Sequence, residues 1–333
     1  MKFFRYIRSL FLLSLPLIGG HIAQILIGVG DTLIVGRYST EALAALVLGT
    51  TIFFIIFILG AGFSFAAMAL VSTANTEGDN TKIRRITRMA LWLSLAFGLL
   101  VSPIFVFSER LLLFLGQEFN LAALASDYLI FSGIAIFPAL SASVLRCYLA
   151  GMEYVKVTFY ISIIAVLLNL LVNYLLVFGM FGLPELGIVG AGIATVFVNL
   201  FMFMSFVIYA KIKLPQHNLF VRFWRPDRGV IGLVLKMGSA IGITSLAEAG
   251  LFSASSIMMG WVGQLELAAH GIALQLASIT FMLHLGLSDA ATIRVSSALG
   301  KKDKNEIIIE CWAAIVISLG LSFLAILIFL GFP

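Results

Sequence analysis

The sequence predicts an all-α polytopic membrane protein, and three observations carry that prediction. Of its 333 residues, 61% are hydrophobic and 11% are charged, and the mean hydropathy is +1.11. A soluble domain of this length would carry roughly a quarter charged residues. The apolar residues form continuous runs of membrane-spanning length, whereas a membrane β-barrel would show alternating polarity. We therefore expect a bundle of transmembrane helices.

Nine apolar segments separated by short polar stretches define the expected spans. They cover approximately residues 10–35, 43–73, 88–107, 122–146, 156–178, 187–210, 230–259, 267–297 and 309–331. The first run follows three basic residues and has no evident small-residue cleavage site, so it predicts a retained span and not a signal peptide. Pro16 and Pro138 lie within spans and are expected to bend them.

Basic residues gather in alternate loops, which orients the chain. The N-terminus and the loops around residues 82–88, 153–156, 211–228 and 301–304 carry most of the lysines and arginines. Basic loops stay in the cytoplasm, so the N-terminus is predicted to be cytoplasmic. The net charge of +5 is mostly loop charge and gives no indication of nucleic-acid binding.

An internal repeat divides the chain. A shift of 224 residues places Gly36 on Gly260, Gly62 on Gly286 and Asp79 on Asp303 without any gap. Chance among common small residues is the alternative, but the constant register and the aligned loop aspartates favour duplication. We expect an amino-terminal lobe at 1–213, a cytoplasmic linker at 214–229 and a carboxy-terminal part at 230–333. The second copy would then hold three helices of an expected six, as in a truncated chain; a complete nine-span protein is the alternative.

Two carboxylates lie inside predicted spans. Glu248 shares the run 230–259 with only one other charge, and the repeat pairs it with Gln24, also polar. A carboxylate at such depth costs several kcal/mol unless it faces a cavity, a partner or a proton. Asp31 follows Gly28 and Gly30 in the outer part of the first span and could bind a proton or a sodium ion. The alternatives are a neutral buried acid at Glu248 and an interfacial acid at Asp31.

Other polar residues within spans have structural interpretations. Asn169 and Asn173 lie one helical turn apart, and the residues alone favour hydrogen bonds between helices over ligation of a cation. His21, like the other span histidines, is interpreted as a packing residue. Asp289 and Arg294 are expected to snorkel to the membrane interface. Cys147 and Cys311 lie far apart, which predicts neither a disulfide framework nor a metal site.

Motifs of soluble enzymes are absent from the sequence. It contains no Walker A sequence, no HExxH and no GxSxG. The chain is therefore not expected to be an enzyme. Any transport that it performs is expected to be driven by an ion gradient, because an ATP site is missing.

Three blocks resemble the multidrug and toxic compound extrusion (MATE) family. They are Pro16 with Gln24 and Gly30–Gly36; Asn169–Tyr174 with Gly182–Gly192; and Glu248–Phe252 with Leu267–His270 and Ala290–Val295. The resemblance implies twelve helices in two six-helix lobes. It also implies secondary-active export of organic cations or drugs from a bacterial inner membrane, by alternating access and in exchange for protons or sodium.

The resemblance assigns roles to individual residues. In the first lobe, transport would be coupled to the ion by Asp31, Asn169, Asn173 and Thr195. A sodium ion would bind at Asp31, Asn169 and Asn173. In the second lobe, the coupling residue would be Glu248. Gln24, His270 and Gln275 are candidates for the substrate cavity. Some family members have an aspartate where Asn173 stands, and the amide here favours protons over sodium. No other cofactor is implied, and a monomer in the bilayer is expected.

Two alternatives to multidrug export are kept. The first is an exporter or flippase of lipid-linked or envelope precursors with the same fold, although such exporters tend to have a strongly basic cavity and bases within the spans are few here. The second is a non-functional fragment of a transporter.

Overall fold

The protein is all-α, as predicted. The computed structural model describes residues 2–331, apart from the side chains of residues 2, 257, 260, 264–268 and 272. Within this part of the chain, nine helices are long and apolar enough to cross a membrane. They are α1 (Lys2–Tyr38), α2 (Thr40–Glu77), α3 (Asn80–Val106), α5 (Phe119–Gly151), α6 (Val155–Phe178), α7 (Gly187–Lys213), α8 (Arg228–Val262), α9 (Gln264–Gly300) and α10 (Lys304–Gly331).

Three shorter elements lie in the connections. The helix α4 (Ser108–Phe114) occupies a segment expected to be a polar loop, and two 3₁₀ turns, η1 (Met180–Gly182) and η2 (Pro215–His217), flank α7. Ser39, Asp79 and Asp227 cap α2, α3 and α8 through side-chain oxygens that accept backbone N–H groups. These caps satisfy donors that a helix start would otherwise leave unpaired.

The predicted repeat is visible in the helix bounds. Equivalent ends are separated by 224 residues: α1 and α8 end at Tyr38 and Val262, α2 and α9 begin at Thr40 and Gln264, and α3 and α10 begin at Asn80 and Lys304. The equivalent residues Asp79 and Asp303 both accept backbone N–H groups at the start of the next helix. The repeat therefore reproduces helix lengths and a cap as well as sequence.

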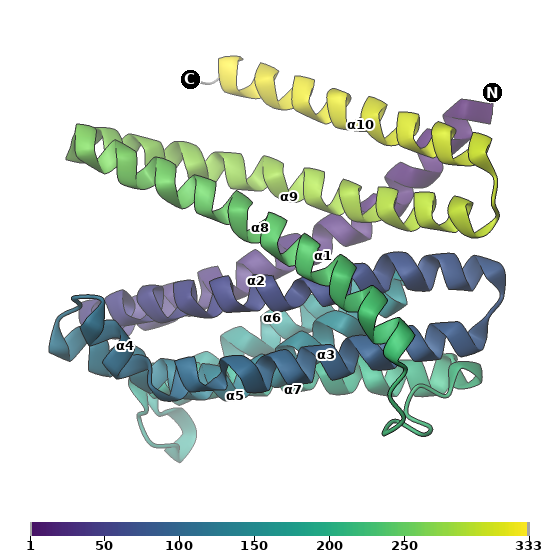
Figure 1. Cartoon of the computed structure of the whole chain (residues 1–333). Coiled ribbons are helices and arrows are strands. Elements are labelled where there is room, and N and C mark those ends of the chain that lie inside the picture. Colours follow the sequence, from purple (N-terminus) through teal and green to yellow (C-terminus); the bar gives the residue numbers. More distant parts are fainter. Residues whose placement is uncertain (1, 332–333) are drawn as a thin grey trace.

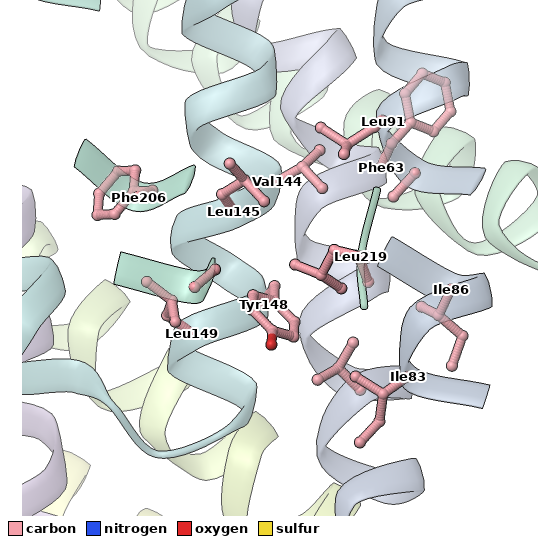
Figure 2. Close-up of a cluster of buried hydrophobic side chains, with 14 of the residues drawn as sticks. Phe63, Ile83, Ile86, Leu91, Val144, Leu145, Tyr148, Leu149, Phe206 and Leu219 are labelled. Atoms are coloured by element: carbon pink, nitrogen blue, oxygen red, sulfur yellow. The ribbon is translucent and has the colours of Figure 1, made fainter. Parts of the chain in front are cut away.

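The first lobe, α1–α7, packs around α5. In it α5 lies against α2, α3 and α7, while α1 lies against α6. One buried cluster joins α2, α3, α5, α7, α8 and residues 214–227. These residues are the part of the predicted linker (214–229) that precedes α8, and we call them the linker. Figure 2 shows Leu219 of the linker among Tyr148 of α5 and Ile86 of α3. Apolar side chains thus hold the linker against the first lobe.

The second lobe meets the first through close backbone contacts. In Figure 1, α8 crosses the first lobe obliquely, and α8 and α9 diverge from it toward the turn that joins them. At the crossing, Gly62 of α2 touches the backbones of Gly238 and Gly242, so a Cβ has no room there. The repeat produces the same contact elsewhere: Gly286, equivalent to Gly62, lies against Ile18, which is equivalent to Gly242.

Hydrogen bonds join the lobes near the end of the bundle that holds the N-terminus and the linker, which we call the basic end. The Ser72 hydroxyl donates to the carbonyl of Ile293 at 2.7 Å, and the Thr73 hydroxyl donates to that of Ser296 at 3.1 Å. The hydroxyls of Thr76 and Ser297 lie 2.9 Å apart. The two lobes therefore touch along α2 and α9 at this end.

The glycine crossing can be tested by adding one methyl group. Gly62→Ala places a Cβ against backbone atoms that cannot rotate away. Overpacking of this kind costs about 1–3 kcal/mol, so the unfolding temperature of the detergent-solubilised protein should fall. Gly232→Ala on α8 is the control, because a Cβ there meets nothing within 4 Å. An equal or higher unfolding temperature for Gly62→Ala would contradict the contact.

Candidate functional site

The structure brings Asp31, Asn169 and Asn173 together. Asp31 of α1 is 5% exposed, and both asparagines of α6 are fully buried. The Nδ2 groups of Asn169 and Asn173 donate to Asp31 Oδ1 at 3.0 and 2.6 Å. The two amides reach the same oxygen because they lie one turn apart on one helix face. The carboxylate therefore has two charge-assisted hydrogen bonds inside the span.

A glycine on α1 allows this approach. A Cβ on Gly30 would lie 2.6 Å from Leu170 Cδ2 and 3.4 Å from Asn169 Oδ1. Small residues let membrane helices come close enough for polar side chains to pair. Gly30 thus sets the distance between α1 and α6 where Asp31 needs its partners.

The amide oxygens give the cluster further binding capacity. The Oδ1 atoms of Asn169 and Asn173 are buried and accept no hydrogen bond from the described residues. Buried polar atoms without partners are rare and costly. Amide and carboxylate oxygens are hard ligands of the kind that alkali cations prefer. In this structure the amides face Asp31 with their nitrogens, so an amide oxygen would join the carboxylate around a cation only after the amide turns over. The two N–H groups that donate to Asp31 favour its charged form, so a proton that binds there must offset the loss of that stabilisation.

Thr195 and a tyrosine lie beside this cluster. The half-buried Thr195 of α7 donates its hydroxyl to the carbonyl of Ala191 at 3.0 Å. Tyr128 of α5 is buried, and its side chain lies close to Thr195 and in the neighbourhood of Asp31. The sequence analysis missed Tyr128. Its signal was a phenol within a predicted span, which many packing tyrosines share.

The remaining candidates have no bond to the Asp31 cluster. The side chains of Glu248 on α8, Gln24 on α1 and Gln275 on α9 are exposed, and among the described residues none of them is hydrogen-bonded to the cluster. His270 is half-buried, with its Nε2 3.3 Å from the Ser255 hydroxyl of α8. The predicted residues therefore separate into a buried or half-buried group on α1, α6 and α7 and a more exposed group on α1, α8 and α9.

Comparison with known proteins assigns the family. The MatE family model matches residues 16–175 and 240–333. A protein of Agrobacterium fabrum named "Probable multidrug resistance protein NorM" is 43% identical over 334 residues, covering 100% of this chain and 72% of the relative. A protein of Rhizobium meliloti with the same name is 42% identical over 332 residues, covering 98% and 71%. The chain belongs to the MATE family.

Solved MATE structures share the fold. The crystal structure of a MATE protein in the bent conformation superposes with a TM-score of 0.86 at 21% identity, covering 99% of this chain and 74% of the other. An outward-facing multidrug resistance MATE transporter gives 0.85 at 20% identity, covering 97% and 71%. The two-lobe MATE architecture predicted from the sequence is thus confirmed. MATE proteins are transporters, so the prediction that the chain is not an enzyme is also confirmed.

Two charged residues of this MATE chain have partners that the sequence did not indicate. The interpretation of Asp289 as a snorkelling side chain is wrong, whereas Arg294 extends to a partly exposed loop residue, in line with expectation. Asp289 is 7% exposed, and its Oδ2 lies 2.8 Å from His21 Nε2. Arg294 bonds to the Ser9 hydroxyl and lies 3.4 Å from a carboxylate oxygen of Glu153. Both pairs tie α9 to the first lobe, and their partners are too distant in sequence to be inferred from spacing.

The Asp31–Asn173 bond predicts coupled stabilities. Asn173→Leu leaves the buried carboxylate with one donor, which should lower the free energy of unfolding by about 1–3 kcal/mol. Adding Asp31→Leu should recover part of that loss, because replacing both partners costs less than orphaning one. Asn199→Leu is the control, since that amide donates only to the Thr195 carbonyl of its own helix. Strictly additive effects in the double mutant would contradict the bond.

Proposed function

We propose that this MATE chain is a secondary-active multidrug exporter of a bacterial inner membrane, with Asp31 as its ion-coupling carboxylate. The exchange is of organic cations or drugs for protons or sodium. One observation carries the proposal: Asp31 is buried in a span and bonded to two amides whose own oxygens accept no hydrogen bond from the described part of the chain. The relatives' name, multidrug resistance protein, supports the substrate class.

The cluster can respond to either ion. Protonation of Asp31 removes the charge that both amide groups stabilise, and a sodium ion could instead be bound by the carboxylate and the two amide oxygens. Asn173 supplies no second charge, which favours protons, since a single carboxylate binds sodium less strongly than a pair. Thr195 and Tyr128 add hydroxyl groups beside the cluster. Glu248 is proposed as the second coupling acid, and Gln24, His270 and Gln275 as cavity residues.

The lobes in this structure are proposed to be in the state closed at the cytoplasmic side. The interlobe hydrogen bonds of Ser72, Thr73 and Thr76 lie at the basic end, which the distribution of charges places in the cytoplasm. Alternating access then requires these contacts, and the His21–Asp289 pair, to separate during each cycle. The lobes are taken as residues 1–213 and 230–333, and the transporter as a monomer.

The coupling role is tested by efflux. Asp31→Asn should reduce export of a fluorescent organic cation to the level of cells without the protein. The amide is always neutral, so it can neither take up and release a proton nor supply the negative charge that attracts sodium. Export from proteoliposomes under an imposed proton gradient, or alternatively a sodium gradient, distinguishes the coupling ion. Asp127→Asn is the control, an exposed carboxylate in the same lobe. Full export by an Asp31→Asn, Glu248→Gln double mutant would refute carboxylate coupling.

Alternating access is tested by tying the lobes together. Thr76→Cys and Ser297→Cys place two thiols where the hydroxyls are 2.9 Å apart, in a background with the exposed Cys311 changed to Ser. Oxidation should stop export and reduction should restore it, because the disulfide prevents the basic end from opening. Each single cysteine variant serves as control. Unchanged export with the cross-link complete on gels would contradict opening at this end.

A further inference from the structure

A cavity of about 540 Å³ lies between the start of α3 and the linker. Ligand sites commonly have volumes of about 300–1,000 Å³. Five arginines line it, together with one carboxylate: Arg84, Arg85, Arg88, Arg222, Arg225 and Asp227. The arginines come from two segments more than 130 residues apart in the sequence, so folding, and not a local charge run, concentrates them.

The cavity has a fixed wall. Arg88 is 7% exposed, and its Nη1 donates to the carbonyls of Val221 and Arg222, both at 2.8 Å. Trp92 Nε1 donates to the carbonyl of Phe223 at 2.9 Å, and the two rings stack. These bonds hold the linker backbone on α3. The side chains of Arg222 and Arg225 are therefore anchored at their backbones beside the cavity.

The charge around the cavity is not balanced. Asp227 lies 3.5 Å from Arg85, and its other oxygen caps α8 by accepting the N–H of Val230. Within the described part of the chain, Arg84, Arg222 and Arg225 form no ion pair within 4 Å. Like charges in a partly buried space repel, and an anion bound among them would offset that repulsion. One guanidinium group can donate two parallel hydrogen bonds to two phosphate oxygens, so a phosphate group is the anion that best matches these arginines.

The cavity lies at the depth of lipid headgroups. Trp92 is 41% exposed and Trp224 is 73% exposed, and both neighbour the lining residues in the sequence. Tryptophan concentrates at the boundary between hydrocarbon and water. The apolar part of α3 begins directly after Arg88. Basic pockets between membrane helices on the cytoplasmic side bind anionic headgroups.

We propose that this cavity binds the phosphodiester headgroup of an anionic phospholipid of the cytoplasmic leaflet. Arg84 of α3 contacts the phosphate from the first lobe, and Arg222 and Arg225 contact it from the linker. The headgroup thereby bridges α3 and the segment that leads into α8. Its binding stabilises the docked linker, and through it the position of the second lobe.

The experiment measures lipid binding by the full chain. The purified protein is placed in phosphatidylcholine nanodiscs with or without phosphatidylglycerol, and bound lipid is counted by native mass spectrometry after release. The triple variant Arg84→Gln, Arg222→Gln, Arg225→Gln should bind phosphatidylglycerol at least about tenfold more weakly. Each basic side chain near an anionic headgroup raises the affinity by roughly tenfold or less, and three are removed. Arg88 is left unchanged because it holds the linker.

The matched control removes the same charge elsewhere on the basic end. Lys301→Gln, Lys302→Gln, Lys304→Gln lies at the turn between α9 and α10, outside the cavity. It should bind phosphatidylglycerol as the unaltered protein does. Equal weakening by both triple variants overturns the site in favour of general surface charge. Absence of any preference for phosphatidylglycerol over phosphatidylcholine also overturns it.

Two further measurements distinguish the lipid from a soluble anion, and a specific arginine site from general positive charge. Glycerol 3-phosphate or inorganic phosphate that displaces the lipid at equal concentration would show a soluble anion as the ligand and overturn the lipid assignment. If the glutamine variant does not accumulate in membranes, Arg84→Lys with Arg225→Lys preserves charge but loses paired phosphate contacts. Weaker phosphatidylglycerol binding by this variant supports a site that needs the paired hydrogen bonds of arginine, and unchanged binding overturns it.

Discussion

The structure depends on one constraint, which is that a polar group inside the hydrocarbon core must find its partner within the protein. Asp31 is bonded to two amides, Asp289 lies against His21, and span hydroxyls donate to carbonyls of their own or of a neighbouring helix. Each of these bonds requires two helices, or two turns of one, to lie at a set distance. The polar groups therefore determine which helices are neighbours, while apolar packing fills the space between them.

The repeat turns one contact into an interface. Because α1–α3 and α8–α10 have equivalent bounds, a close approach built into one copy recurs in the other. Gly62 against Gly242 and Gly286 against Ile18 are the two versions of that approach. They differ in one respect: Ile18 brings a side chain where Gly242 brings none. The interface is thus only approximately symmetric, which leaves the two halves free to have different polar groups, such as Gln24 in one and Glu248 in the other.

Residue patterns predicted the spans, the repeat and Asp31 as a candidate site, but not the side chains that Asp31 and the other buried polar groups bond to. Hydropathy reports which segments are buried in lipid, so the nine spans could be placed. Their polar ends were missed: α1 begins at Lys2 and α3 at Asn80, where the apolar runs predicted starts at 10 and 88. The seven residues of α4 were missed because so short a helix between polar residues has no periodicity to detect. Asn169 and Asn173, read alone, favoured helix contacts; the family resemblance placed them near Asp31. His21 and Asp289 stand 268 residues apart, and no spacing rule links such a pair.

The helix α1 connects the proposed coupling site to the interlobe contacts. Asp31 and its glycine neighbour Gly30 face α6 within the first lobe, whereas Ile18 and His21 of the same helix face α9 of the second. A change at Asp31 alters the attraction between α1 and α6, and α1 transmits any resulting movement along its length. Pro16 lies within this helix and removes one backbone hydrogen bond, which makes bending there less costly than elsewhere. The proposed coupling therefore needs no chain of side chains across the protein, because α1 carries both Asp31 and the interlobe contacts of Ile18 and His21.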